Sequence, residues 1–232
     1  MKKSKIMKVL FSMLLFAFSC NEQKKIELQY SSATDHEGNK FKIVIIDNME
    51  WSTENLQVTT YLNGDKINKS NTIEEFEKFG DLHEGCYFIN EEKGEILYNW
   101  YTIIDNRGIA PEGWHVSTKG DWKKILAIFS DKGSTNADPF KSKTGWPDRG
   151  FANHNEKIEQ KGTNESGLNI KQLSQTHGND GVHSASFWTN TSEPNFFGEG
   201  SAWYIGIYYH NVDIDFFQHP KRWGRSIRIV KD

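Results

Sequence analysis

Apolar residues recur along the chain with two different periods, which predict where helices and strands lie. The clearest helical pattern covers residues 119–130, where Trp122, Ile125, Leu126 and Phe129 fall three and four residues apart on one face. Thr118 can cap this helix, because its hydroxyl can accept a hydrogen bond from the first turn. A shorter helix is predicted for residues 72–79, where Thr72 and Glu75 match a capping box.

Short runs of β-branched and aromatic residues predict strands in the first half of the chain and near its end. Residues 202–209 and 212–217 are predicted as a hairpin that turns at His210-Asn211. In the last strand, alternation places Ile227 and Ile229 on one side and Arg228 on the other. The predicted strands are 41–46, 51–56, 86–89, 186–190, 202–209, 212–217 and 225–230.

The remaining residues are polar and predict connections between these elements. Residues 35–39 read as a turn that leads into the first strand, and residues 131–180 read as long loops. Residues 20–34 lack an amphipathic period and are predicted to be a polar tether, with the folded domain spanning 35–232. One clear helix, short antiparallel sheets and long loops predict a single α+β domain.

The first 19 residues have the pattern of a secretory signal peptide. Four lysines precede an apolar run at residues 9–18 that is too short to span a bilayer. Cys20 follows small residues and precedes polar ones, which resembles the lipobox of bacterial lipoproteins, although Ala17 stands where Leu is usual. This resemblance implies that Cys20 carries a lipid and holds the chain at the cell envelope, on the outer membrane or the cell surface. An ordinary cleaved signal peptide or a short membrane anchor would also fit the pattern.

Charge and cysteine content narrow the possible partners. Four of the 28 basic residues and none of the 31 acidic residues lie in residues 1–19, which leaves the rest of the chain with a net charge of −7. An acidic domain is a poor candidate for nucleic-acid binding, so no such partner is predicted. If Cys20 is acylated, Cys86 has no intrachain partner, and we predict that it is a small buried hydrophobic residue.

Histidines and carboxylates do not form a recognisable catalytic or metal-binding motif. His115 precedes the clearest helix and could act as a base or metal ligand, but without a second ligand at suitable spacing a structural role is favoured. Asp213 and Asp215 alternate along a strand and more simply form a solvated face. We predict no cofactor and no metal. Surface positions are predicted for the scattered histidines: His154, His177, His183, His210 and His219.

Aromatic residues are the best indication of ligand binding, since they make up 13% of the chain. Exposed indole and phenyl rings suit contacts with amphipathic ligands, because they add contact area at low entropic cost. Trp146, Phe151 and Trp223 lie in predicted loops and are the candidate ligand-binding residues. The tryptophans expected in the core are Trp100, Trp114, Trp122, Trp188 and Trp203.

Several segments resemble the Fibrobacter succinogenes major paralogous domain, a family of bacterial secreted and lipoprotein modules. Residues 97–101 read LYNWY, residues 108–118 read GIAPEGWHVST, and ENL at 54–56, FWTNTSE at 187–193 and RSIRIVKD at 225–232 also match. The resemblance covers about residues 35–232 and implies a fold similar to the C-type-lectin-like group. Ile229 stands where the family has a cysteine, so a bridge from there to the region of Cys86 would be lost.

The family has no settled activity, so we predict the function from the expected cellular location and from the amino-acid composition. We expect a non-catalytic surface module that binds a glycan or a protein. An envelope hydrolase with a site built from loops is the alternative, and a structural envelope component without a ligand is a third. The formylglycine-generating relatives of the lectin-like group depend on cysteine chemistry, which a lone Cys86 does not offer.

Overall fold

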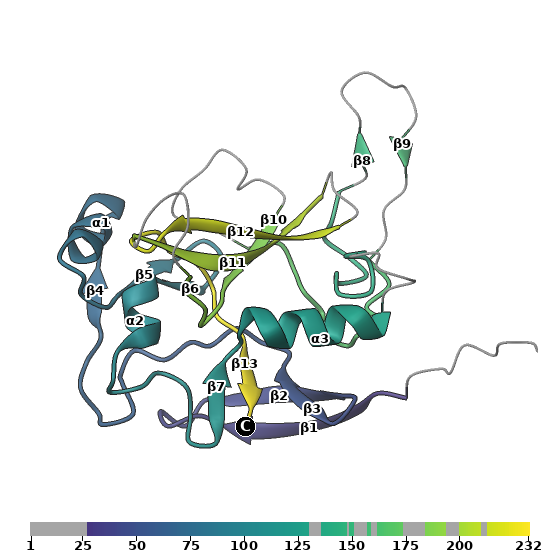
Figure 1. The fold of residues 1–232 in the computed structure, drawn as a ribbon, viewed down its shortest axis with the longest axis horizontal. Helices are drawn as coiled ribbons and strands as arrows, with labels where there is room; N and C mark the ends of the chain where they lie inside the picture. Colours follow the sequence, from purple (N-terminus) through teal and green to yellow (C-terminus); the bar gives the residue numbers. More distant parts are fainter. Residues whose placement is uncertain are drawn as a thin grey trace, which may run out of the picture.

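The computed structural model describes residues 27–129, 136–147, 149–150, 157–158, 162–173, 184–193, 200–209 and 213–232. Helices and several small, mostly antiparallel sheets alternate along the chain, which confirms the predicted α+β class (Figure 1). None of the helices in this described part is long and apolar enough to cross a membrane.

The largest sheet brings the two ends of the described chain together. Its five antiparallel strands lie in the order β1 (Gln29–Thr34), β2 (Lys40–Ile46), β3 (Met49–Ser52), β13 (Ile229–Lys231) and β7 (Trp114–Val116). Val44 pairs with Trp51, Trp51 pairs with Val230, and Val230 pairs with His115, so one register crosses four strands. The final strand therefore closes the sheet that the first strands begin.

Three smaller sheets complete the strand structure. β10 (Ser184–Trp188), β11 (Ser201–Tyr208) and β12 (Ile214–Pro220) form an antiparallel sheet. β4 (Asn68–Ser70) lies parallel to β5 (Cys86–Asn90), which pairs with β6 (Glu95–Tyr98) in the antiparallel direction. β8 (Arg149–Gly150) pairs with β9 (Lys157–Ile158). The predicted hairpin of the last strands is confirmed, while its turn at His210-Asn211 lies outside the described residues.

Two predicted helices are confirmed. α3 (Lys119–Phe129) buries Trp122, Ile125 and Leu126, and the backbone N–H of Asp121 donates to the Thr118 hydroxyl. α1 (Ile73–Asp81) begins at the predicted cap, since Thr72 accepts from the Glu75 N–H. A third helix, α2 (Trp100–Ile104), was not predicted, because five residues are too few to display a helical period.

The core lies on both sides of the large sheet and is divided into two clusters. One cluster packs α3 between the large sheet and the β10–β12 sheet, as Figure 1 shows. The other joins β2 and the loop after β3 to β6, α2 and the last strand. Ile227 and Ile229 belong to this second cluster and Val230 to the first, so the predicted alternation in the closing segment is confirmed.

The predicted tether is wrong for its last six residues. Gln29–Thr34 form β1, whose main chain pairs with β2 from Gln29↔Ile45 to Thr34↔Lys40. This strand lies at the edge of the sheet with mostly exposed polar side chains, so it carries no hydrophobic signal. The ordered domain therefore extends N-terminal to Asp35, while residues 20–26 lie outside the described part.

Candidate functional site

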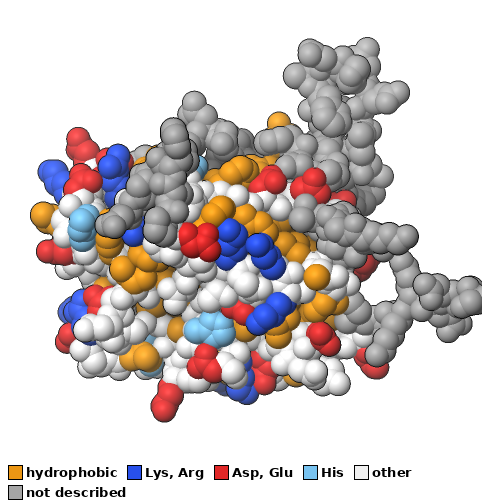
Figure 2. Space-filling model, viewed as in Figure 1, with side chains coloured by type: hydrophobic (Ala, Val, Ile, Leu, Met, Phe, Trp, Pro, Cys, Tyr) orange, Lys and Arg blue, Asp and Glu red, His pale blue; other side chains and the backbone are white. Residues whose placement is uncertain are grey.

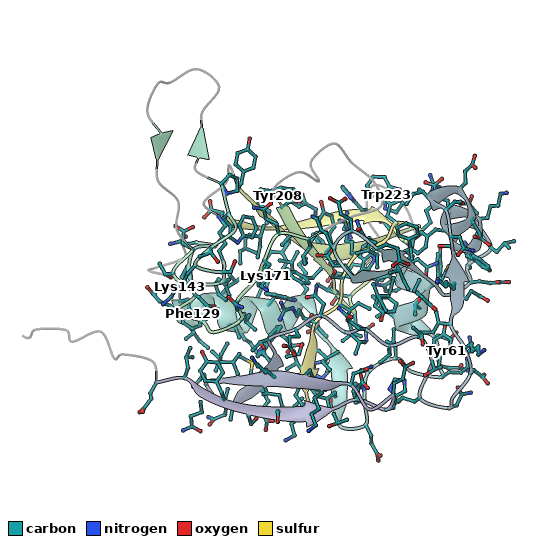
Figure 3. The ribbon with its side chains drawn as sticks, turned by 180° about the vertical axis from the view of Figure 1, so that it is seen from behind. Tyr61, Phe129, Lys143, Lys171, Tyr208 and Trp223 are labelled. Carbon is teal, nitrogen blue, oxygen red and sulfur yellow. The ribbon has the colours of Figure 1, made fainter. Side chains whose placement is uncertain are left out.

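Two of the three predicted aromatic residues, Trp146 and Trp223, pack against different core clusters. The Trp146 indole N–H donates to the Ile170 carbonyl at 3.0 Å, and its ring packs at the edge of the α3 cluster. Trp223 packs against the other cluster, with its ring edge-on to His219 at 4.5 Å between centroids. Trp223 and Tyr208 lie on the side of the molecule that carries the β10–β12 sheet (Figure 3). Phe151 lies outside the described residues.

His115 is held between two carboxylates, as the structural interpretation predicts. Its Nδ1 lies 2.7 Å from Asp232 Oδ1, and its Nε2 lies 3.0 Å from Asp121 Oδ2. The same Asp121 oxygen accepts from the Thr118 N–H and hydroxyl. Burial raises the pKa of Asp121, but these hydrogen bonds and His115 lower it by more, so the net shift is downward. Because both ring nitrogens are engaged, His115 links β7, α3 and the last residue rather than facing a substrate.

The remaining candidate groups are scattered histidines and two aspartates of the β12 region, only some of which lie in the described part of the chain. His219 is half-buried beneath Trp223, while His154, His177, His183 and His210 lie outside the described residues. Asp213 forms an isolated bridge with Asn136, and Asp215 lies on β12. Within the described ranges, no group of three or more His, Cys, Asp and Glu side chains could hold a metal ion. Cys86 is fully buried, as predicted.

The structure instead forms a cleft where the β1–β2 turn approaches the segment after β3. Its volume is about 400 Å³, which is within the size range of small-molecule sites. Apolar residues of β2, the 52–57 segment and β13 line it together with residues that carry carboxylate, amide, hydroxyl and amino groups. The lining residues are Asp35, Asn39, Lys40, Phe41, Ser52, Glu54, Asn55, Leu56, Gln57 and Ile229.

One lip of the cleft is the turn at residues 35–39, which is fixed from within. Asp35 Oδ1 accepts the backbone N–H groups of Glu37 and Asn39, and its Oδ2 accepts from the Asn39 amide. This is the local side-chain bonding that favours Asp in turns. Gly38 adopts a φ of 88°, a conformation that glycine tolerates best. The predicted turn is therefore confirmed and forms part of a cleft.

Glu37 joins this lip by hydrogen bonds to Thr59 and Thr60, which follow the 52–57 segment in the chain. A single carboxylate oxygen accepts the N–H groups of Thr59 and Thr60, at 2.7 and 2.6 Å, and both hydroxyls. Burial raises the pKa of Glu37, but the four hydrogen bonds lower it by more, so the net shift is downward. His36 adds a contact from Nε2 to the Thr60 carbonyl. The lip is thus held in position before any ligand arrives.

The opposite lip is the segment that follows β3. Ser52 accepts the Ile229 N–H, and Glu54 Oε2 accepts the Lys42 N–H at 3.0 Å. Asn55 differs from these neighbours, because its Oδ1 is buried without a hydrogen-bond partner. A side-chain amide that has no bonds within the protein can turn toward a ligand without breaking any. Sequence reasoning singled out ENL at 54–56 only as a family motif and missed it as a cleft wall.

The chemistry of the cleft is that of multiple hydrogen bonds above a small apolar surface. Glu54, Asn55 and Gln57 contribute planar polar side chains to the lining, and Lys40 lines the same cleft. Apolar floors with a few oriented polar groups are typical of sites that bind small polar molecules. The face drawn in Figure 2 mixes acidic, basic and apolar side chains without a continuous region of one sign.

Comparisons with known proteins support the resemblance found in the sequence. The family model described as the Fibrobacter succinogenes major domain matches residues 44–231. This match includes β3, the 52–57 wall of the cleft and β13, but begins after the 35–39 turn. No curated protein and no solved structure matches the chain.

Proposed function

Since the chain belongs to the Fibrobacter succinogenes major domain family, a family without a settled activity, we propose its function from the cleft. The chain is a non-catalytic glycan-binding module, held at the cell envelope by a lipid on Cys20. The composition of the cleft carries this proposal: side-chain amides and carboxylates surround an apolar floor. Such groups match the hydroxyl-rich edges and C–H faces of a sugar ring.

A C-type-lectin-like arrangement is part of the proposal. The meeting of the first strands with β13 in one sheet supports it, as do the long connections between the later elements. Recognition uses direct hydrogen bonds from the cleft rather than a bound cation. The fixed 35–39 lip supports this mode, because a preorganised wall lowers the entropic cost of binding.

A glycan array tests the proposal with the full chain in detergent micelles. We expect binding of one glycan class, and we expect Asn55→Ala to weaken it about tenfold, equivalent to about 1.4 kcal/mol. Asn55→Ala should leave the unfolding temperature unchanged or higher, because it removes a buried polar atom without a partner. Asn71→Ala is the matched control, since Asn71 lies outside this cleft.

Loss of stability together with binding in Asn55→Ala would mean that Asn55 is a structural residue. Absence of binding to every glycan class would contradict the proposal and leave a protein ligand or a structural role. The lipid is tested separately by incorporation of labelled palmitate, which we expect Cys20→Ala to abolish. These two experiments can fail independently.

An envelope hydrolase is the second candidate, because the carboxylates of Asp35 and Glu54 line the same cleft. Both are already engaged: Asp35 holds its own turn with both oxygens, and Glu54 accepts the Lys42 N–H. This commitment to structure favours binding over catalysis. Mass spectrometry of array glycans after incubation would reveal cleavage and would favour the hydrolase.

A further inference from the structure

A buried arginine near the end of the chain has no carboxylate partner. Arg228 is 3% exposed, and its Nη1 donates to the Ser52 carbonyl at 2.9 Å. No described carboxylate lies within ion-pair distance of it, and its Nε–H has no acceptor. Burial lowers the pKa of Arg228 to about 9, although Glu54 raises it. A buried charge with so few bonds costs several kcal/mol unless a counter-charge is present.

Two further buried donors lack acceptors on the same face of the closing segment. They are the Trp51 indole N–H and the Ser226 hydroxyl, both in fully buried residues. Ser226, Arg228 and Val230 alternate onto one side of the chain, because Ile227 and Ile229 belong to the opposite cluster. Trp51 pairs directly with Val230. The three donors therefore share the face that α3 covers.

Ring contacts connect these donors around one layer of the core. The Arg228 guanidinium lies 5.4 Å from the centre of the Phe187 ring, and Phe187 forms a bridge with Ser226. Phe187 stacks on Trp122 at 5.7 Å, and Trp122 contacts Trp51 edge-on at 4.9 Å. Arg228 and Ser226 thus lie beside Phe187, and Trp51 lies beside Trp122, the ring on which Phe187 stacks. Each of the three residues has a buried donor without an acceptor, and Arg228 adds a positive charge.

We propose that Trp51, Ser226 and Arg228 form an internal site for a monovalent anion of halide size. The anion accepts from the Arg228 Nε–H, the Trp51 indole N–H and the Ser226 hydroxyl. A water molecule could satisfy these donors but would leave the guanidinium charge unbalanced. Because all three residues are buried in the core, the proposed site favours a small anion over a larger oxyanion. By fixing Arg228, the anion would also hold the position of Ser52, whose carbonyl accepts a hydrogen bond from Arg228 and which lines the cleft.

Thermal unfolding of the full chain in detergent tests the proposal. At constant ionic strength, replacing methanesulfonate by chloride should raise Tm by about 5 °C, because the smaller anion binds only the folded state. Arg228→Met should remove this chloride dependence. Arg107→Met should retain it, since Arg107 forms ion pairs with Asp65 and Asp105 and contacts Tyr61 of the other core cluster. Equal Tm values in both salts would overturn the proposal.

Crystals of the unaltered chain grown in bromide provide a test that does not depend on a variant folding. We expect an anomalous scattering peak within hydrogen-bond distance of Arg228 Nε and Trp51 Nε1. A water molecule without anomalous signal at that position, or Arg228→Met with undiminished chloride dependence, would contradict the anion site.

Discussion

The buried Arg225 helps to determine the protonation of His219, a residue of β12. The Arg225 guanidinium lies 3.6 Å from the centre of the Tyr204 ring and donates to Ser186 Oγ and to His219 Nδ1. Because Nδ1 accepts this bond, His219 is neutral and carries its proton on Nε2, which faces the Tyr204 hydroxyl at 3.4 Å. Burial, with help from the Arg225 charge, lowers the pKa of His219 to about 4.

This arrangement predicts a loss of stability in mild acid. The pKa of His219 is lower in the folded chain than its ordinary 6.5, so the contribution is complete above pH 6.5 and disappears as the pH falls toward 4. Partial exposure reduces the effect, and we expect a loss of about 2 kcal/mol over this range. Urea unfolding at several pH values measures it in the unaltered chain and in His219→Gln.

The difference between these two proteins isolates His219 from the carboxylates that also titrate in acid. His83→Gln is the control, because His83 is exposed and stacks on Tyr101 at the surface. We expect His83→Gln to keep the full pH dependence and His219→Gln to lose the part between pH 4 and 6.5. Identical pH profiles for all three proteins would show that His219 titrates normally in the folded state.

At the scale of elements, α1 depends on its N-terminal cap. Thr72 accepts the Glu75 N–H, and the Glu75 carboxylate accepts the Asn71 N–H at 2.8 Å, so the two ends of the first turn satisfy each other. We expect Thr72→Ala to lower the free energy of unfolding by about 1 kcal/mol. Chemical denaturation measures this loss. Thr144→Ala, at an exposed position in a loop, should change stability by less than about 0.5 kcal/mol.

The C-terminal turn of α1 depends on close contact with the loop after β12. A Cβ atom added at Gly80 would lie 2.2 Å from Arg222 Cβ and 2.7 Å from its Cα. Backbone atoms cannot yield as a flexible side chain would, so we expect Gly80→Ala to destabilise the chain by about 2 kcal/mol. Gly200→Ala is the control, since a Cβ there meets nothing within 4 Å. Equal stability of the two variants would mean that α1 shifts freely.

Elements differ in how well the sequence predicts them, and the difference has a physical cause. α3 and β2 were predicted because each buries a repeating set of apolar side chains. β1 was not predicted, since main-chain pairing with β2 holds it while its side chains face solvent. The Trp146 indole N–H donates to the carbonyl of Ile170, 24 positions further along the chain, and no local sequence pattern reveals this contact.

At the scale of the whole molecule, the cleft shows why sites escape sequence reasoning more often than folds do. The residues of its walls come from three places: the 35–39 turn and the 52–57 segment meet because β2 pairs with β3, and Ile229 joins them because β13 also pairs with β3. The turn and the ENL motif were each visible in the sequence. Their meeting with Ile229 was not, because it depends on pairing between β3 and a strand at the other end of the described chain.

Counting thiols tests the fold and the proposed anchor in one measurement. Cys86 is fully buried, and burial raises the pKa of its thiol to about 12, so a thiol reagent should not reach it in the native chain. If Cys20 carries a lipid, Cys86 is the single free thiol of the chain. We therefore expect no reactive thiol in detergent alone and one per chain after denaturation.

A cysteine variant, measured under native and denaturing conditions, shows which of the two cysteines supplies a reactive thiol. Cys86→Ser should show no reactive thiol under either condition, because a lipidated Cys20 has none to offer. Two thiols per denatured chain would show that Cys20 is unmodified and would remove the basis for a lipid anchor. A thiol that reacts in the native chain but is lost in Cys86→Ser would instead mean that the layer around β5 opens readily. The number of thiols in the denatured chain therefore tests the lipid on Cys20. The reactivity of the native chain tests the burial of Cys86, because only that reactivity depends on the fold.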